Sequence, residues 1–158
     1  MIKLNLIIVT LLFITIGNAQ EQQTIAKLLI KHAKWNTTDI SKETVLQRGI
    51  IVFYFANDDT TLYMSNVRNA GNSQSFGPLI PIKNDSSDVD IHSGNIESIS
   101  YQWSYYNTYD GQAGLAEVKV LKIKNPYKGN TYAIKIFPEN QDILNYNGEF
   151  LGANNIFK

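Results

Sequence analysis

The sequence contains no cysteine among its 158 residues. Disulfide bridges, thiolate-bound zinc and a cysteine nucleophile are therefore excluded, and so is lipid attachment to an N-terminal cysteine. A domain of this length buries enough surface to fold without disulfides. The missing cysteines thus remove several classes of enzyme and anchor without weakening the case for a stable fold.

The sequence also lacks an excess of charge of either sign. It has 14 basic and 14 acidic residues, and the basic residues form no continuous run. Proteins whose main partner is nucleic acid or anionic lipid usually carry a basic patch or stripe. The sequence therefore predicts neither nucleic acid nor an anionic membrane surface as a partner.

Only one long apolar run is present, and it lies at the N-terminus. Lys3 precedes the apolar residues 4–16, and small residues follow just before Gln20. This order is typical of a secretory signal peptide, so we expect residues 1–19 to be removed and residues 20–158 to form a single globular domain. Because no second run is long enough to span a bilayer, we expect a secreted or periplasmic protein without a membrane span.

Residues 22–35 are predicted to form an N-terminal amphipathic helix. Its apolar stripe recurs at helical spacing and consists of Ile25, Leu28, Leu29, His32 and Ala33. Polar residues lie mainly off that stripe, as they do in a helix packed on a sheet. Residues 39–48, which follow, are compatible with either one short helical turn or the start of a strand.

From Gly49 onward the apolar pattern changes to the two-residue period of β-strands. Strands are predicted at Ile50–Ala56, Thr61–Val67, Ser75–Ile82, Ile96–Asn107, Leu115–Lys124 and Thr131–Phe137, with a short further segment at Glu149–Leu151. Gly77, Pro78 and Pro81 favour an edge or irregular position for the third of these. A change of phase after Val120 predicts a β-bulge there.

These elements predict the α+β class, with one N-terminal amphipathic helix packed on a curved antiparallel sheet of six or seven strands. The alternative is a small up-and-down β-barrel. In both arrangements alternate strand residues face one core. The residues expected to be mainly buried are Ile51, Phe53, Phe55, Leu62, Met64, Ile99, Tyr101, Trp103, Val118, Val120, Ile134 and Ile136.

Aromatic residues are concentrated between positions 100 and 110. Tyr101, Trp103 and Tyr105 alternate along one strand and stand about 6.7 Å apart on one face, a spacing suited to stacking on sugars or an apolar peptide. Because the opposite face carries Ser and Gln, packing of this face in the core is the favoured interpretation. Tyr106 and Tyr109 lie off that face or in the turn and are the better candidates for exposed contacts. All five are candidate ligand contacts.

Catalytic motifs are missing. The chain has no G-x-S-x-G, H-E-x-x-H, P-loop or G-x-G-x-x-G sequence. Asp88, Asp90 and His92 would share one side of an extended segment, an arrangement able to bind a divalent cation. That segment lacks the EF-hand pattern, and a solvated surface loop is the favoured interpretation. We therefore predict no catalytic residue, no metal and no cofactor.

Three functional hypotheses remain, and the sequence predicts no oligomeric state. The favoured one is a non-catalytic exported module that binds a protein, peptide or glycan. The second is an envelope or immunity-type protein that blocks another protein's site. The third is a small hydrolase that uses two carboxylates. That enzyme would require a pocket holding two acids drawn from Asp58, Asp59, Asp110, Glu117 and Glu149.

Overall fold

The computed structural model describes residues 23–56, 60–68, 73–82, 96–124, 127, 129–140, 142–152 and 154–157. The predicted signal peptide and the segment containing Asp88, Asp90 and His92 lie outside these residues.

The chain is built almost entirely of β-strands. In order, the elements are β1 (Gln23–Trp35), β2 (Thr38–Asp39), α2 (Ser41–Leu46), β3 (Ile50–Phe55), β4 (Leu62–Arg68), β5 (Ser73–Pro81), β6 (Ile96–Asn107), β7 (Ala113–Ile123), β8 (Thr131–Pro138) and β9 (Leu144–Phe150). Neighbouring strands from β3 to β9 pair in chain order, and every pair is antiparallel.

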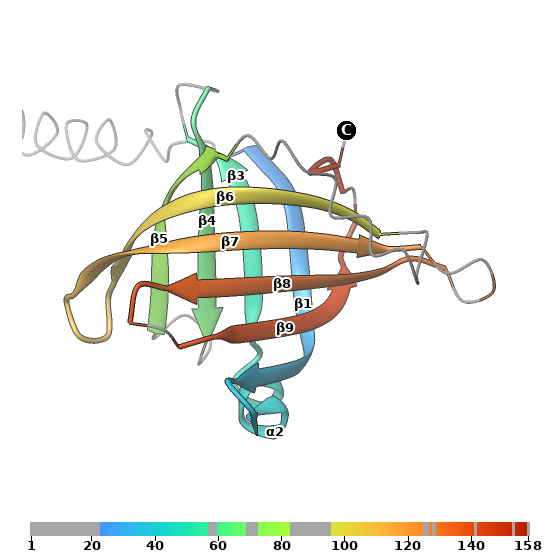
Figure 1. Cartoon of the computed structure of the whole chain (residues 1–158), viewed down its shortest axis with the longest axis horizontal. Helices are drawn as coiled ribbons and strands as arrows, with labels where there is room; N and C mark the ends of the chain where they lie inside the picture. Colours follow the sequence, from blue (N-terminus) through green and yellow to red (C-terminus); the bar gives the residue numbers. More distant parts are fainter. Residues whose placement is uncertain are drawn as a thin grey trace, which may run out of the picture.

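The sheet closes into an eight-stranded barrel because β1 has two long partners (Figure 1). The first half of β1 pairs with β3, and its second half pairs with β9. The short β2 pairs only with the end of β1. The predicted α+β arrangement, a helix on an open sheet, is therefore wrong. The architecture is the up-and-down barrel held as the alternative.

The N-terminal segment is a strand whose two-residue period is disguised by shifts of register between Thr24 and Ala26 and between Ile30 and His32. Ala26, Leu28 and Ile30 are buried and alternate, as inward-facing strand residues do. The register then shifts between Ile30 and His32, and Ala33 becomes the next buried residue. A bulge of this kind inserts a three-residue step into a two-residue period, which resembles helical spacing. The helix expected at residues 22–35 is consequently β1.

Elsewhere two local expectations were also wrong. The register between β6 and β7 is continuous from Ile96 to Tyr106, so no bulge occurs near Val120. Leu121 lies instead on the outer face, where it is half-buried. The strand expected at an edge is β5, a nine-residue strand with β4 on one side and β6 on the other. Its pairing with β6 is interrupted at Gly77 and Pro78.

Inward-facing side chains fill the middle of the barrel. Of the residues expected to be buried, Ile51, Phe53, Met64, Tyr101, Trp103, Val118, Val120, Ile134 and Ile136 are buried. Phe55, Leu62 and Ile99 are only half-buried. These three lie toward the ends of their strands, where the barrel meets solvent.

The two ends of the barrel differ. At one end Tyr132 packs against Phe150 with ring centroids 4.5 Å apart, and Phe157 lies 6.2 Å from Tyr132. Ile156 is buried there as well. At the other end lies α2, which is held to β1 by hydrogen bonds between Ser41 Oγ and the backbone of Ala33. Apolar side chains thus cover the first end, whereas a cavity opens at the α2 end.

Candidate functional site

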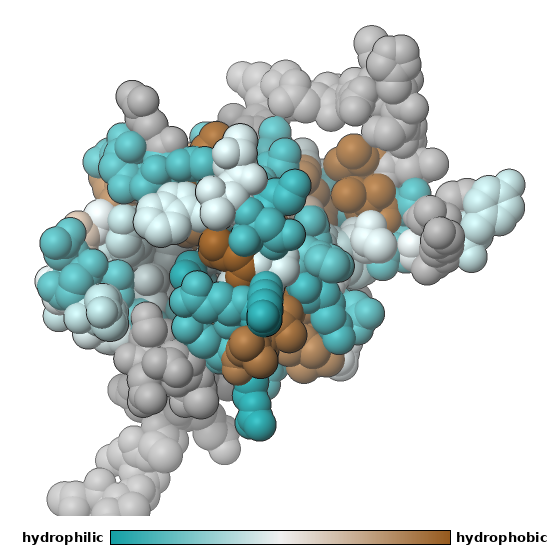
Figure 2. Space-filling view, turned by 90° about the horizontal axis from the view of Figure 1, so that it is seen from below, coloured by the Kyte–Doolittle hydropathy of each residue, from teal (hydrophilic) through white to brown (hydrophobic). Residues whose placement is uncertain are grey.

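A cavity of about 700 Å³ opens at the α2 end of the barrel. The strand ends and α2 that surround it contribute Trp35, Glu43, Gln47, Asn66, Arg68, Ser75, Trp103, Tyr105, Asn107, Tyr109, Ile136, Pro138 and Leu144. Figure 2 looks onto this end, where hydrophilic residues cover most of the surface and a few hydrophobic ones emerge between them. The volume of the cavity lies within the range of pockets that hold small-molecule ligands.

Two polar residues of the cavity wall, Asn66 and Arg68, contact Tyr146, a fully buried residue of β9. The Arg68 guanidinium donates to its hydroxyl through Nη2. Asn66 donates to the same oxygen through Nδ2, over 3.3 Å. Arg68 and Asn66 belong to β4, which β1 and β3 separate from β9 in the barrel wall. These contacts therefore cross the interior and form a polar layer above the apolar core.

Within this layer two polar groups keep unused hydrogen-bonding capacity. The Asn66 side chain is 6% exposed, and its Oδ1 has no partner in the part of the chain that the structure describes. No carboxylate of those residues lies within ion-pairing distance of Arg68. Buried polar groups are nearly always hydrogen-bonded, so an unpartnered one at a cavity wall indicates a place for a ligand or an ordered water.

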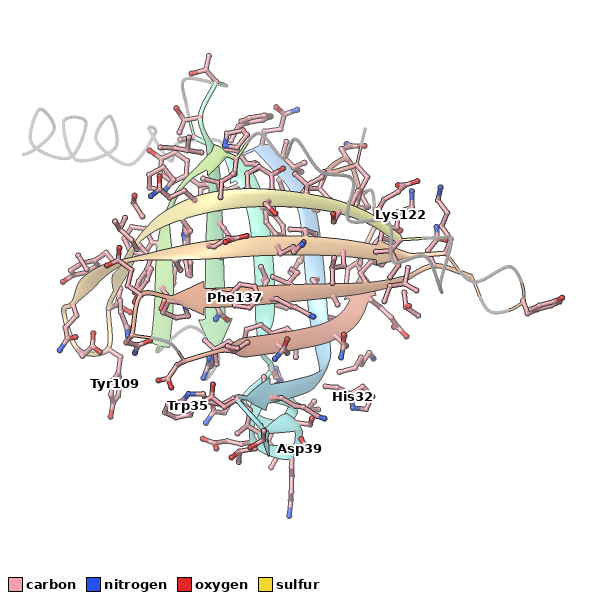
Figure 3. The ribbon with its side chains drawn as sticks, in the orientation of Figure 1. His32, Trp35, Asp39, Tyr109, Lys122 and Phe137 are labelled. Carbon is pink, nitrogen blue, oxygen red and sulfur yellow. The ribbon has the colours of Figure 1, made fainter. Side chains whose placement is uncertain are left out.

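Aromatic rings form one wall of the cavity. Trp103 and Tyr105 lie side by side on β6, with ring centroids 4.9 Å apart and planes inclined by 36°. The indole of Trp103 is fixed because its Nε1 donates to the Gly77 carbonyl over 3.2 Å. Trp35 and Tyr109 stand at the α2 end of the molecule in Figure 3 and line the same cavity. The wall therefore offers flat apolar surfaces from its depth to its opening.

The structure brings three of the five candidate contact residues together. Trp103, Tyr105 and Tyr109 line the cavity. Tyr101 is buried in the barrel core, where burial raises the pKa of its phenol. Tyr106 lies on the outer face and packs edge-on against Phe76 at 6.1 Å. Tyr101 and most of the Trp103 side chain pack in the barrel core. Farther along β6 the same face lines the cavity.

Sequence analysis missed Asn66, Arg68 and Tyr146. The strand alternation carried a signal for the first two, because Met64, Asn66 and Arg68 share one face of β4 and Met64 faces the core. Polar residues in line with a core residue indicate a polar group inside the barrel. No comparable signal singles out Tyr146, which lies about 80 residues away in the chain.

Among the described residues that line the cavity one is an acid, and it lies at the opening. Glu43 belongs to α2, is exposed, and accepts a hydrogen bond from Gln47 Nε2 over 3.1 Å. Arg68 thus places a positive charge inside the cavity, and Glu43 places a negative charge at its opening. An anionic group is attracted most strongly next to Arg68.

The carboxylates expected of a hydrolase do not gather in this cavity. Asp110, Glu117 and Glu149 are exposed and lie on different elements, and Asp58 and Asp59 fall outside the described residues. A second hollow of about 440 Å³ on the outer surface is lined by Glu117 and Glu139, together with Phe137 (Figure 3). Both of its acids are solvent-exposed.

A metal site is not formed by the described part of the chain either. There, no three His, Asp or Glu side chains are grouped closely enough to hold a metal ion. The suggested set of Asp88, Asp90 and His92 lies outside those residues. In the same described ranges, no helix is both long enough and apolar enough to cross a membrane.

The two tryptophans should report separately on the depth and the opening of the cavity. Trp103 is 3% exposed and Trp35 is 51% exposed. The Trp35→Phe variant, in which Trp103 remains, is expected to emit at a blue-shifted wavelength and to resist acrylamide quenching. The matched Trp103→Phe variant should emit at longer wavelength and be quenched readily. Ready quenching of Trp103 would contradict its placement inside the barrel.

In comparisons with protein-family models, curated proteins and solved structures the chain matches none, so its function is inferred from the geometry of this cavity.

Proposed function

We propose that the protein is a non-catalytic barrel that binds a small molecule in the cavity at its α2 end. The observation that carries this proposal is the cavity of about 700 Å³ whose wall holds a buried polar atom, Asn66 Oδ1, without a partner among the described residues. Ligand pockets typically combine apolar and aromatic walls with a few fixed polar groups, and the mouths of β-barrels are frequent places for them.

The shape of the site favours a small molecule over the protein, peptide or glycan expected from sequence. Eight-stranded barrels are just wide enough either to be filled by side chains or to hold one small ligand. Here both occur, since core residues fill the middle and the cavity occupies one end. A cavity that ends on a packed core accepts a compact molecule or the end of a chain, and it does not accept the surface of a folded protein.

The N-terminal sequence extends the proposal to location. Residues 1–19 have the order of a signal peptide. We propose that the barrel acts in the periplasm or outside the cell after their removal. N-terminal sequencing of the protein recovered from outside the cytoplasm should then begin at Gln20.

The binding proposal is tested with the neutral fluorescent dye N-phenyl-1-naphthylamine, which brightens in an apolar site. We expect saturable binding with a dissociation constant on the order of 10 μM. The Ser75→Phe variant should weaken dye binding at least about tenfold, because Ser75 lines the cavity and a phenyl ring occupies part of its volume.

The matched control is Asn147→Phe, which adds the same ring on the exposed outer face of β9. Its dye affinity should equal that of the wild-type protein. A wild-type barrel that binds no dye would contradict the proposal. Equal losses in both variants would also contradict it, because the dye would then not occupy the cavity.

A further inference from the structure

We infer that the ligand of this cavity is a 2-hydroxycarboxylate that carries an aromatic ring on a short linker. The inference rests on the proposed binding function and names the chemical class of the ligand. It follows from three features of the cavity: the charge of Arg68, the acceptor of Asn66 that has no partner among the described residues, and the ring surfaces of Tyr105, Trp35 and Tyr109.

Arg68 selects the carboxylate. A guanidinium has five N–H donors in one plane. Among the described residues Arg68 donates only to Tyr146, which leaves a pair of donors to bind both oxygens of a carboxylate. The guanidinium carbon lies 5.8 Å from the centre of the Tyr146 ring, a contact that helps to hold the group in place. Since Arg68 is half-buried and no described carboxylate pairs with it, an anionic ligand would supply the missing partner.

Asn66 selects the neighbouring hydroxyl. Its Oδ1 is a pure acceptor without a partner among the described residues, and a hydroxyl of the ligand would satisfy it. Asn66 and Arg68 donate to the same Tyr146 oxygen, which places the two side chains next to each other. The ligand's donor must therefore stand close to its carboxylate. An ammonium group would meet repulsion from Arg68, whereas a hydroxyl would not.

The ring surfaces of Tyr105, Trp35 and Tyr109 select an aromatic body. These rings line the same cavity as Arg68 and keep accessible surface, so a flat ring can bury large area against them without ordering many rotatable bonds. The arrangement thus matches a ring joined by a short linker to a 2-hydroxycarboxylate.

The inference is tested with three compounds that share an indole ring and a three-carbon side chain: indole-3-lactate, indole-3-propionate and indole-3-propionamide. Each competes with N-phenyl-1-naphthylamine, which is excited where indole does not absorb. Charge-assisted hydrogen bonds to Arg68 should make the propionate bind about tenfold more tightly than the amide. The hydroxyl should make the lactate bind about threefold more tightly than the propionate.

Two variants assign these preferences to residues. Arg68→Gln should bring propionate and amide to equal affinity. Asn66→Leu should bring lactate and propionate to equal affinity while the preference for acid over amide remains. Dye binding by each variant shows whether its cavity is intact. If Arg68→Gln does not fold, Glu43→Gln serves instead, because removing the acid at the opening should raise the affinity of both acids about twofold and leave the amide unchanged.

The outcomes separate the two proposals. If the dye binds in the cavity but the amide competes as well as the acids, the ligand class is wrong and the binding function stands. If lactate and propionate bind equally, the hydroxyl is wrong and the inference is overturned. If the wild-type protein does not bind the dye, the binding function itself fails.

Discussion

Replacing Gly148 with alanine is expected to lower the free energy of unfolding by about 3 kcal/mol or more. Gly148 lies on β9 opposite Ile30, at the point where β1 and β9 close the barrel. A Cβ atom built there would stand 2.0 Å from the Leu29 carbonyl oxygen. Because that neighbour is backbone and belongs to the paired strand, the clash is relieved only by separating β9 from β1.

Urea denaturation followed by far-ultraviolet circular dichroism measures this loss. The matched control is Asn147→Ala, one residue earlier on the same strand, where the side chain is exposed. Its free energy of unfolding should stay within about 0.5 kcal/mol of the wild-type value. A Gly148→Ala protein as stable as this control would show that β1 and β9 do not form the closure described here.

Replacing Phe53 with alanine should lower the free energy of unfolding by about 3–5 kcal/mol. Phe53 is fully buried on β3, where it pairs with Met64 and faces the middle of the barrel. Removing the ring takes away buried apolar surface and leaves a void that neighbouring strands cannot fill without bending. The same denaturation experiment measures the effect.

The matched control for Phe53→Ala is Val52→Ala. Val52 is the preceding residue on β3 and is half-buried on the outer face, so truncating it should cost about 1 kcal/mol. The affinity of Phe53→Ala for N-phenyl-1-naphthylamine should remain at the wild-type value. Phe53 lies one inward-facing position deeper than Ile51, which pairs with Asn66 of the polar layer. A large loss of dye affinity would instead show that the cavity reaches into the core.

Strand periodicity predicted most of the barrel wall from local sequence. The Ser and Gln residues on one face of residues 96–107 separated that face from the aromatic one, and Tyr101 and Trp103 are buried as the alternation indicated. The same pattern placed Ile134 and Ile136 correctly in β8. Alternation is readable in a single strand because a half-buried strand needs an apolar residue at every second position.

The N-terminal strand could not be identified in this way. Its bulge near Lys31 moves the inward positions from Ile30 to Ala33, and the local spacing then resembles that of a helix. What makes the segment a strand is its pairing with β3 and with β9, whose residues lie far along the chain. Tertiary contacts of this kind regularly override local propensity.

The sequence by itself determined the absence of cysteine chemistry, the balanced charge and the positions of most strands, because composition and alternation are properties of the linear chain. Only the tertiary structure decided that the sheet closes and that one end is hollow. It also brought Asn66 and Arg68 to Tyr146, about 80 residues away in the chain. The physical reason is that a cavity is the space left between side chains, and closure of the barrel determines which side chains face that space.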